Sequence, residues 1–215
     1  MNGTIPERIG QLTSLRVLSL GNNMLFGTIP PSIGNLINLN YFILSNNKLS
    51  GSLPSSIGSI TSLTILDVNK NKLSGSVPSS IMSLPLLQTL NLRNNQLEGN
   101  LDSSLNLPKI QIFIAAYNGL TGTIPLSFGN LSELRTLDLK ENQLSGTLFT
   151  LNSPSFQYLD VSSNVLSGTL PSFENEKLRY LDVSFNSLSG TVPSSLGKLT
   201  LLITLYLTGN QFCGG

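Results

Sequence analysis

Leucine and asparagine recur along the whole chain at fixed distances from one another. In the first complete copy, residues 12–30, three leucines stand in the spacing LxxLxL, and an asparagine, a glycine and a proline follow at constant offsets: Leu15, Leu18, Leu20, Asn23, Gly27 and Pro30. The spacing recurs around nine asparagines, which are Asn23, Asn47, Asn71, Asn95, Asn118, Asn142, Asn164, Asn186 and Asn210. They are 24, 24, 24, 23, 24, 22, 22 and 24 residues apart. This period predicts a solenoid of nine stacked coils.

The alternation within each copy predicts its local structure. Residues Arg16–Asn22 alternate as a half-buried strand does, with Leu18 and Leu20 facing inward. Asn23 follows the strand, and we expect its amide to bond backbone groups that the turn leaves unpaired, so that an alanine there costs about 1–3 kcal/mol. Pro30 is expected to open a helical turn, and a serine after the proline of later copies is expected to support that first turn.

Three copies depart from this pattern. Asp102 stands where a proline is expected, and the copies that follow Asn142 and Asn164 are two residues short. We expect the return segment that contains Asp102 to be less ordered, and those of the two short copies to be extended or turn-like with little helix. The curvature of the array is expected to change between Phe149 and Lys177.

The phrases NKLSGSLPSSIGS, NKLSGSVPSSIMS, NGLTGTIPLSFGN and NSLSGTVPSSLGK resemble the plant-type leucine-rich repeat, whose consensus runs LxxLxxLxLxxNxLxGxIPxxLGx. The resemblance covers essentially the whole chain. It implies an α/β solenoid, an arc with a parallel β-sheet on its concave face and short 3-10, α or irregular segments on its convex face. We expect one domain over residues 1–215, with a partial repeat at 1–11 and nine repeats at 12–215.

Both ends of the sequence lack the capping units that the resemblance implies. Met1 precedes NGTIP, which aligns with the middle of the next copy. Phe212, Cys213 and Gly214 resemble the end of many such arrays, but the second cysteine usual there is absent. We therefore expect a fragment whose terminal coils expose apolar edges.

Composition narrows the classes of function. The chain has 12 basic and 11 acidic residues and a net charge of +1, so no broad basic surface is predicted for nucleic acid or an anionic membrane. No apolar run reaches the ~18 residues of a membrane helix. With no histidine and one cysteine, the chain offers no internal disulfide, no His/Cys metal site and no histidine base for its serines. We expect no enzyme activity, no cofactor and no bound metal.

The outward strand positions of the nine coils are expected to form one surface with rungs about 4.8 Å apart. Its first column is Val17, Tyr41, Ile65, Thr89, Ile112, Thr136, Tyr158, Tyr180 and Thr204. Its second column is Ser19, Ile43, Asp67, Asn91, Ile114, Asp138, Asp160, Asp182 and Tyr206, and positions further along add Lys70, Arg93, Ala116, Tyr117, Lys140, Glu141 and Phe185. The tyrosines, isoleucines and aspartates of these columns, with Lys70, Arg93, Lys140 and Phe185, are the candidate ligand contacts. Such a composition is typical of protein-binding hot spots, although β-branched and aromatic residues also favour strands whichever way they point.

Two further arrays suggest chemistry. Asp138, Asp160 and Asp182 fall on successive rungs, where like charges repel unless a basic peptide, a cation or the nearby Lys140, Arg135 and Arg179 neutralise them. Hydroxyl residues flank the glycine of most copies, at Ser50/Ser52, Ser74/Ser76, Thr121/Thr123, Ser145/Thr147, Ser167/Thr169 and Ser189/Thr191. Certain plant-type repeat proteins bind ice, and these columns raise that hypothesis, although Glu98 and Asn100 interrupt them.

The resemblance implies a binding module similar to the extracellular domain of receptor-like proteins or kinases. Such a module would recognise a protein or peptide on its concave sheet, with a co-receptor as a further partner, outside the cell or at its surface. Asn2 in NGT and Asn130 in NLS match the glycosylation acceptor pattern and agree with that location. A secreted inhibitor of the polygalacturonase-inhibitor type and an ice-binding protein are the alternatives.

Overall fold

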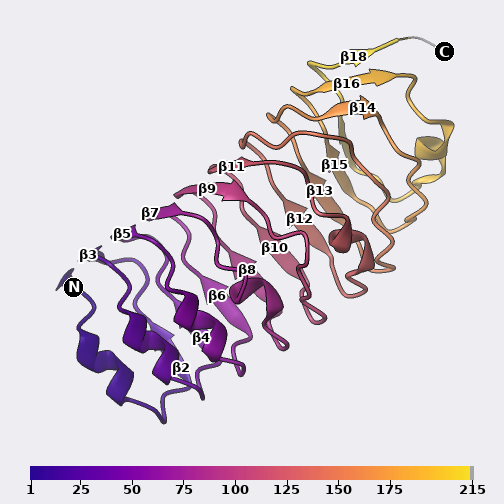
Figure 1. Ribbon diagram of the computed structural model, residues 1–215. Helices are drawn as coiled ribbons and strands as arrows, with labels where there is room; N and C mark the ends of the chain where they lie inside the picture. Colours follow the sequence, from indigo (N-terminus) through magenta and orange to yellow (C-terminus); the bar gives the residue numbers. More distant parts are fainter. Residues whose placement is uncertain (214–215) are drawn as a thin grey trace.

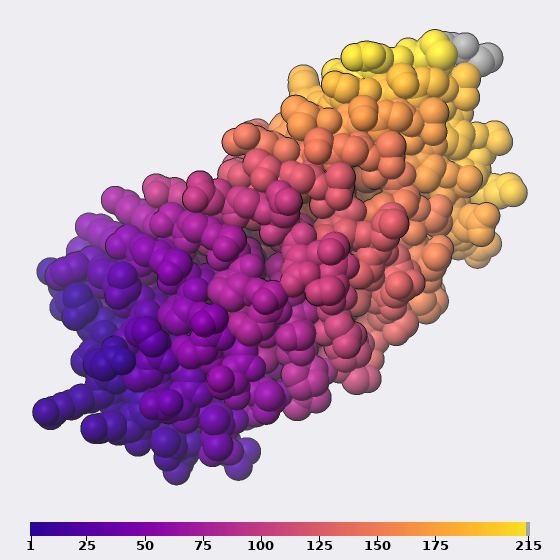
Figure 2. Space-filling view, in the orientation of Figure 1, coloured from indigo at the N-terminus to yellow at the C-terminus, as the bar shows by residue number. Residues whose placement is uncertain are grey.

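The chain forms a curved stack of coils with its two ends at opposite ends of the stack (Figure 1). The computed structural model describes residues 1–213, and Gly214 of the terminal motif and Gly215 lie outside the described residues. In the space-filling view the colours follow one another in bands, so each coil contacts the coils next to it in sequence (Figure 2). The predicted leucine-rich repeat arc is confirmed.

One parallel sheet of nine strands runs through the stack, and each coil contributes one strand in chain order. The strands are β2 (Val17–Ser19), β4 (Tyr41–Ile43), β6 (Ile65–Asp67), β8 (Thr89–Asn91), β10 (Ile112–Ile114), β12 (Thr136–Asp138), β13 (Tyr158–Asp160), β15 (Tyr180–Asp182) and β17 (Thr204–Tyr206). The first strand is shorter than the predicted range Arg16–Asn22. Every neighbouring pair has the register that the repeat alignment predicts, as in Tyr158↔Tyr180 and Asp160↔Asp182.

A second layer of strands, which the hydrophobic pattern did not predict, lies along one edge of the coils. Six strands form one sheet, β1 (Asn2–Gly3), β3 (Met24–Gly27), β5 (Lys48–Gly51), β7 (Lys72–Gly75), β9 (Gln96–Asn100) and β11 (Gly119–Thr121). Three strands form another, β14 (Ser167–Thr169), β16 (Ser187–Gly190) and β18 (Gln211–Phe212). Single bridges at Thr123↔Ser145 and Thr147↔Ser167 connect the two sheets across the coil of Asn142.

The return segments carry short 3-10 helices where the sequence keeps its proline pattern. They are η1 (Glu7–Gln11), η2 (Pro31–Asn35), η3 (Ser55–Ser59), η4 (Ile81–Ser83), η5 (Leu126–Asn130) and η6 (Ser194–Lys198). The copies after Asn95, Asn142 and Asn164, all within the described range, contain no helix, and this was predicted for the last two. The expectation that serine supports the first turn is wrong, because no helix has a side-chain cap bond, and Ser56 Oγ instead donates to Pro31 O of the preceding coil at 2.7 Å.

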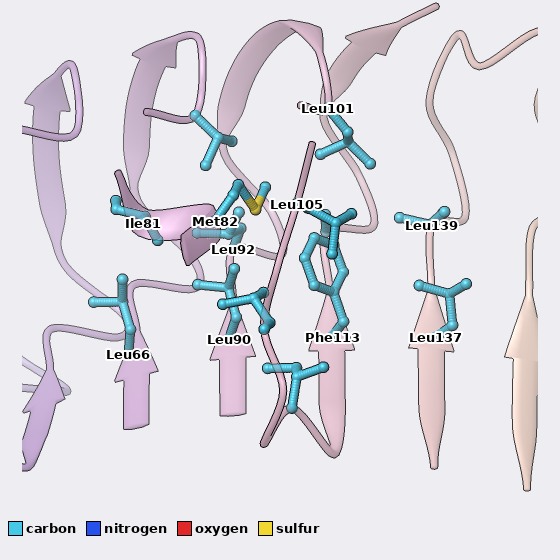
Figure 3. Packing of buried hydrophobic residues seen from close by; sticks show 14 of the residues in the cluster. Leu66, Ile81, Met82, Leu90, Leu92, Leu101, Leu105, Phe113, Leu137 and Leu139 are labelled. Atoms are coloured by element: carbon cyan, nitrogen blue, oxygen red, sulfur yellow. The ribbon is translucent and has the colours of Figure 1, made fainter. Parts of the chain in front are cut away.

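The core is continuous from coil to coil. Leu66, Leu90, Phe113 and Leu137 lie in one row on neighbouring strands and are fully or almost fully buried (Figure 3). Each inward leucine stabilises the fold by about 1.5–3 kcal/mol through the apolar area that it buries. Apolar side chains at both ends of the stack, among them Leu12 and Ile203, are exposed.

The anchor asparagines join each coil to the one before it. Asn47 Nδ2 donates to Leu44 O at 3.0 Å in its own coil and to Leu20 O at 2.9 Å in the preceding coil, and its Oδ1 accepts from Leu25 N at 2.9 Å. The anchors from Asn71 to Asn210 repeat these three bonds. The predicted structural role of the ladder is confirmed.

Candidate functional site

The outward positions of the nine-stranded sheet form one face, which we call the concave face. Both predicted columns are present on it from Val17 to Thr204 and from Ser19 to Tyr206. Among the candidate contacts, Tyr41, Lys70, Phe185 and Tyr206 are exposed. Those that are half-buried are Ile43, Ile65, Asp67, Arg93, Ile112, Ile114, Tyr117, Lys140, Tyr158 and Tyr180.

Four outward assignments need correction for burial. Ala116 is fully buried, so its outward assignment is wrong. Arg93 forms an ion pair with Asp138 at 3.0 Å, two strands away, and therefore lies across the coil that carries Ala116. Asp138, Asp160 and Asp182 keep their places on the face, but only 4%, 3% and 5% of their surface is exposed.

The three aspartates have a structural task at the ends of their strands. Asp160 Oδ1 accepts from Ser162 N at 3.0 Å and from Ser162 Oγ at 2.6 Å, and Asp182 makes the same two bonds to Ser184. These are Asx turns, in which a side-chain oxygen bonds the backbone two residues on. Asn91 does the same with Arg93 N at 3.2 Å, so the turn needs the oxygen and not the negative charge.

Two of the aspartates on this face, Asp138 and Asp160, have a raised pKa. Burial raises the pKa of Asp160, and the like charge of Asp182 raises it further against the bonds from Ser162. Burial also raises the pKa of Asp138, by more than Lys140 and Arg93 lower it. Of the predicted basic neighbours Lys140, Arg135 and Arg179, the charge of Lys140 lowers the pKa of Asp138 and Asp160. The ion pair of this column is formed by Arg93, with Asp138.

Tyrosines cover the C-terminal part of the face. The rings of Tyr158 and Tyr180 stack at 4.3 Å with 9° between their planes, and Tyr206 meets Tyr180 edge-on at 6.2 Å. Burial, and then the charge of Asp160, raise the pKa of Tyr180 to about 12, so the Tyr180 hydroxyl stays neutral. Near the middle of the face, the guanidinium of Arg93 lies 4.7 Å from the ring centre of Tyr117, within cation–π range.

A cavity of about 370 Å³ opens beside this aromatic group. It is lined by four of the candidate contacts, Lys140, Asp182, Phe185 and Tyr206, together with Glu141, and by the hydroxyl residues Ser162, Ser163, Ser184 and Thr208. No sequence pattern singles out these four hydroxyl residues, because serine and threonine are frequent in every copy.

Backbone geometry marks several of the candidates as unusual. The residue before each anchor asparagine has a left-handed backbone, and asparagine or glycine, which suit it, stand there in four coils, at Asn22, Asn46, Asn94 and Gly209. Tyr117 and Phe185 occupy the same position with φ of 57° and 53°. Bulky residues are strained in this region, and Phe185 is also 61% exposed, so its ring contributes little to the core.

Other candidate features lie away from the concave face. Asn2 and Asn130 are exposed, the latter at the end of η5. Cys213 is exposed and free. In the part of the chain that the structure describes, no group of three or more His, Cys, Asp or Glu residues is arranged to hold a metal ion, and no helix is both long and apolar enough to cross a membrane.

Comparisons with known families and structures agree with this geometry. One profile described as leucine-rich repeat matches residues 37–97, and another matches residues 14–36 and 177–199. No curated protein sequence matches the chain.

Solved structures similar to the chain include an ice-binding protein from a plant, with 33% identity over 99% of this chain and 70% of that one and a TM-score of 0.88. The Arabidopsis receptor kinase HAESA ectodomain, in complex with an extended IDA peptide hormone, is 36% identical over 98% of this chain, with a TM-score of 0.91. The plant peptide hormone receptor RGFR1, in complex with RGF2, is 32% identical over 98% of this chain, with a TM-score of 0.79. The chain spans only 36% and 38% of the lengths of these two receptors.

Proposed function

The chain belongs to the leucine-rich repeat family, and on that premise we propose that its concave face binds a peptide or protein ligand, as part of an extracellular receptor-like module. The structures of the similar receptors RGFR1 and HAESA were solved in complex with peptide hormones, and that of HAESA also with the co-receptor SERK1. The proposed role is recognition and not catalysis. In an extracellular module the exposed acceptor Asn130 would lie outside the cell, where a sugar could be attached.

The observation that carries this proposal is the pair of aromatic side chains held on a left-handed backbone. Phe185 and Tyr117 stand where asparagine would relieve the strain, and Phe185 is mostly exposed. The ring of Phe185 would clash with any side chain at Gly209, because a Cβ there would lie 2.7 Å from Phe185 Cδ1. The ring of Phe185 thus occupies space beside Gly209 although it adds little to the core. Exposed aromatic side chains of this kind are frequent anchors in binding sites.

The proposal is tested with Phe185→Asn. Peptides are first selected from a displayed random library on the unmodified chain, and the dissociation constant of the best peptide is measured by calorimetry. Asparagine suits the backbone here, so F185N should keep or raise the midpoint of urea unfolding while weakening peptide binding at least tenfold, or about 1.4 kcal/mol. Tyr117→Asn should also weaken binding, although it removes the stacking on Arg93 as well.

Asn22→Gly is the matched control, since it changes the same turn position in the first coil and should leave binding within twofold. Selection of no peptide, or equal affinity of F185N and the unmodified chain, would reject the concave face as the binding surface.

Ice binding is the second candidate, favoured by one specific array. The residue that follows the edge glycine is exposed at each position that the structure describes, and it carries a hydroxyl at all of them except Asn100: Thr4, Thr28, Ser52, Ser76, Asn100, Thr123, Thr147, Thr169 and Thr191. This column of hydroxyls lies away from the concave face, and its spacing supports the hypothesis. A structural reason for it also exists, because Thr28 Cγ2 packs where a Cβ on Gly51 would be, 2.9 Å away.

Inhibition of ice recrystallisation by the isolated chain separates the two candidates. Thr123→Asn lengthens the natural interruption at Asn100, and it should abolish activity at the column while F185N leaves it unchanged. A chain without ice activity at high concentration would remove this second candidate.

A further inference from the structure

Resting on the proposed concave-face function, we infer that the C-terminal part of this face selects peptides that present an arginine or lysine side chain to the group formed by Tyr158, Tyr180, Tyr206 and Phe185. The step beyond peptide binding is the chemistry of the ligand, a cationic side chain seated among aromatic rings. We call these four residues the aromatic group.

The aromatic group offers ring surface to solvent in a recess of limited size. Tyr206 is 50% exposed and Phe185 is 61% exposed, and both line the cavity of about 370 Å³. That volume is at the low end of small-molecule sites, so it suits one side chain better than a whole folded element. The faces of aromatic rings carry negative potential and attract ammonium and guanidinium groups within about 6 Å. The chain already uses this contact internally, where Arg93 covers Tyr117 at 4.7 Å.

The charge around the recess favours a cation over a neutral or acidic group. Asp138 is compensated by Arg93, whereas Asp160 and Asp182 form no ion pair with any residue in the described range 1–213. Their Oδ2 atoms have only long contacts, from Tyr158 Oη to Asp160 at 3.5 Å and from Tyr180 Oη to Asp182 at 3.4 Å. An added cation would therefore meet the carboxylate of Asp182 in the lining of the recess, with that of Asp160 on the neighbouring strand. Because both carboxylates are buried, their charge is weakly screened.

Basic residues near the recess do not cancel this charge. The lining of the recess contains one basic residue, Lys140, and two acidic residues, Glu141 and Asp182. Arg135 and Arg179 precede their strands, three residues before Asp138 and Asp182, and their side chains are exposed at the opposite strand ends. The charges of the lining therefore leave the recess negative in a chain whose total charge is +1.

The negative charge is not required by the fold. The Asx turn at this strand position works with Asn91 in β8, where the amide oxygen accepts the same backbone bond. An asparagine at position 160 or 182 would satisfy the turn and remove the charge. The structure thus carries buried charge beyond what its turns need, and the raised pKa of Asp160 supports the view that this charge is under-compensated in the free chain.

The test uses the peptides selected on the unmodified chain. The enriched peptides should be rich in arginine or lysine, and replacing the key arginine of the best peptide by glutamine should weaken binding at least tenfold. Asp182→Asn and Asp160→Asn should each weaken it by a similar factor, as should Tyr206→Leu. Asp102→Asn is the control, because Asp102 makes the same kind of turn bond to Ser104 N at 2.8 Å on a return segment away from the concave face, and it should change the dissociation constant less than twofold.

Each result is informative. Circular dichroism of D160N and D182N should match that of the unmodified chain, and if one variant fails to fold the other still reports. Enrichment of neutral or acidic peptides whose binding is lost in F185N would overturn the cationic preference and keep the proposed function. Basic peptides that bind D160N and D182N as well as the unmodified chain would also overturn it. Failure to enrich any peptide would overturn both proposals.

Discussion

The coils of Asn47 and Asn71 and the coils of Asn164 and Asn186 share one strand register but differ behind it. The first two anchors are 24 residues apart, and the return segment between their strands contains η3. The second two are 22 residues apart, and the residues between β14 and β15 form no helix. The nine-stranded sheet continues unchanged through both regions. The inward leucines and the asparagine ladder therefore set the sheet, and the return segment can shorten without disturbing it.

The same two regions also differ in what covers an identical backbone position. Asp67 in β6 is half-buried beside Ile43 and Ile65, whereas Asp160 in β13 is buried under the tyrosine stack. Both accept the same Asx-turn bond. The comparison teaches that the backbone of this array is repeated while its chemistry is decided by neighbours on adjacent rungs.

The largest expected effect comes from breaking the core at an interior coil instead of an end. Leu181 and Leu205 are register partners on β15 and β17, but Leu181 is fully buried and Leu205 is 41% exposed. Leu181→Ala should lower the free energy of unfolding by about 2–5 kcal/mol, because it removes apolar contacts and leaves a cavity. Leu205→Ala should cost less than about 1 kcal/mol. Urea unfolding of both variants measures the difference, and equal losses would mean that the last coil is as well packed as the interior.

The second-largest expected effect is the loss of stability when a glycine is replaced by alanine in a tightly packed return segment, compared with a loosely packed one. Gly58 in η3 lies so close to the next coil that a Cβ would be 2.4 Å from Ser80 Cβ. Gly129 in η5 faces a copy without a helix, and its nearest contact would be Thr150 O at 3.4 Å. Gly58→Ala should therefore cost about 1–3 kcal/mol by overpacking. Gly129→Ala should stay within about 0.5 kcal/mol, as a surface substitution does.

Thermal and urea unfolding measured on both glycine variants decide between these values. A similar cost for the two would show that the shortened copy after Asn142 still packs as closely as the regular ones.

The sequence was sufficient for the parts of the fold that depend on local spacing. Both outward columns, the inward leucines, the asparagine ladder and the two short copies without helix follow from a period of two within strands and of 22 to 24 along the chain. Tyr158 could be placed beside Tyr180 for the same reason.

Features that depend on contacts between coils could not be read from one copy. The edge sheets are held by bonds between neighbouring coils, and LSG within a single copy is typical of a turn. Arg93 pairs with Asp138, two strands away, and Ser56 bonds the coil before it instead of its own helix. The burial of Asp160 depends on where two tyrosine rings stack, which spacing alone does not determine.

The smallest expected effect is a pH dependence that belongs to the tyrosine-covered region. Because the pKa of Asp160 is raised in the folded chain, the folded state holds this proton more tightly than the unfolded chain, whose value is about 3.9. The contribution of Asp160 to stability is therefore most favourable below about pH 3.9, and it falls as the pH rises through the raised folded value. The pKa of Asp138 is raised too, but Asp138 is present both in Asp160→Asn and in the unmodified chain, so the comparison isolates Asp160.

The D160N variant should thus gain stability relative to the unmodified chain as the pH is raised from 4 to 7, and the difference should level off above the raised pKa. Urea unfolding at intervals across this range measures it, and carbon NMR of the carboxyl groups locates the titration directly. A difference between the two proteins that is constant with pH, or that moves against D160N as the pH rises, would mean that the charge of Asp160 is compensated within the free chain. The recess would then lack the unpaired charge that favours a cationic ligand.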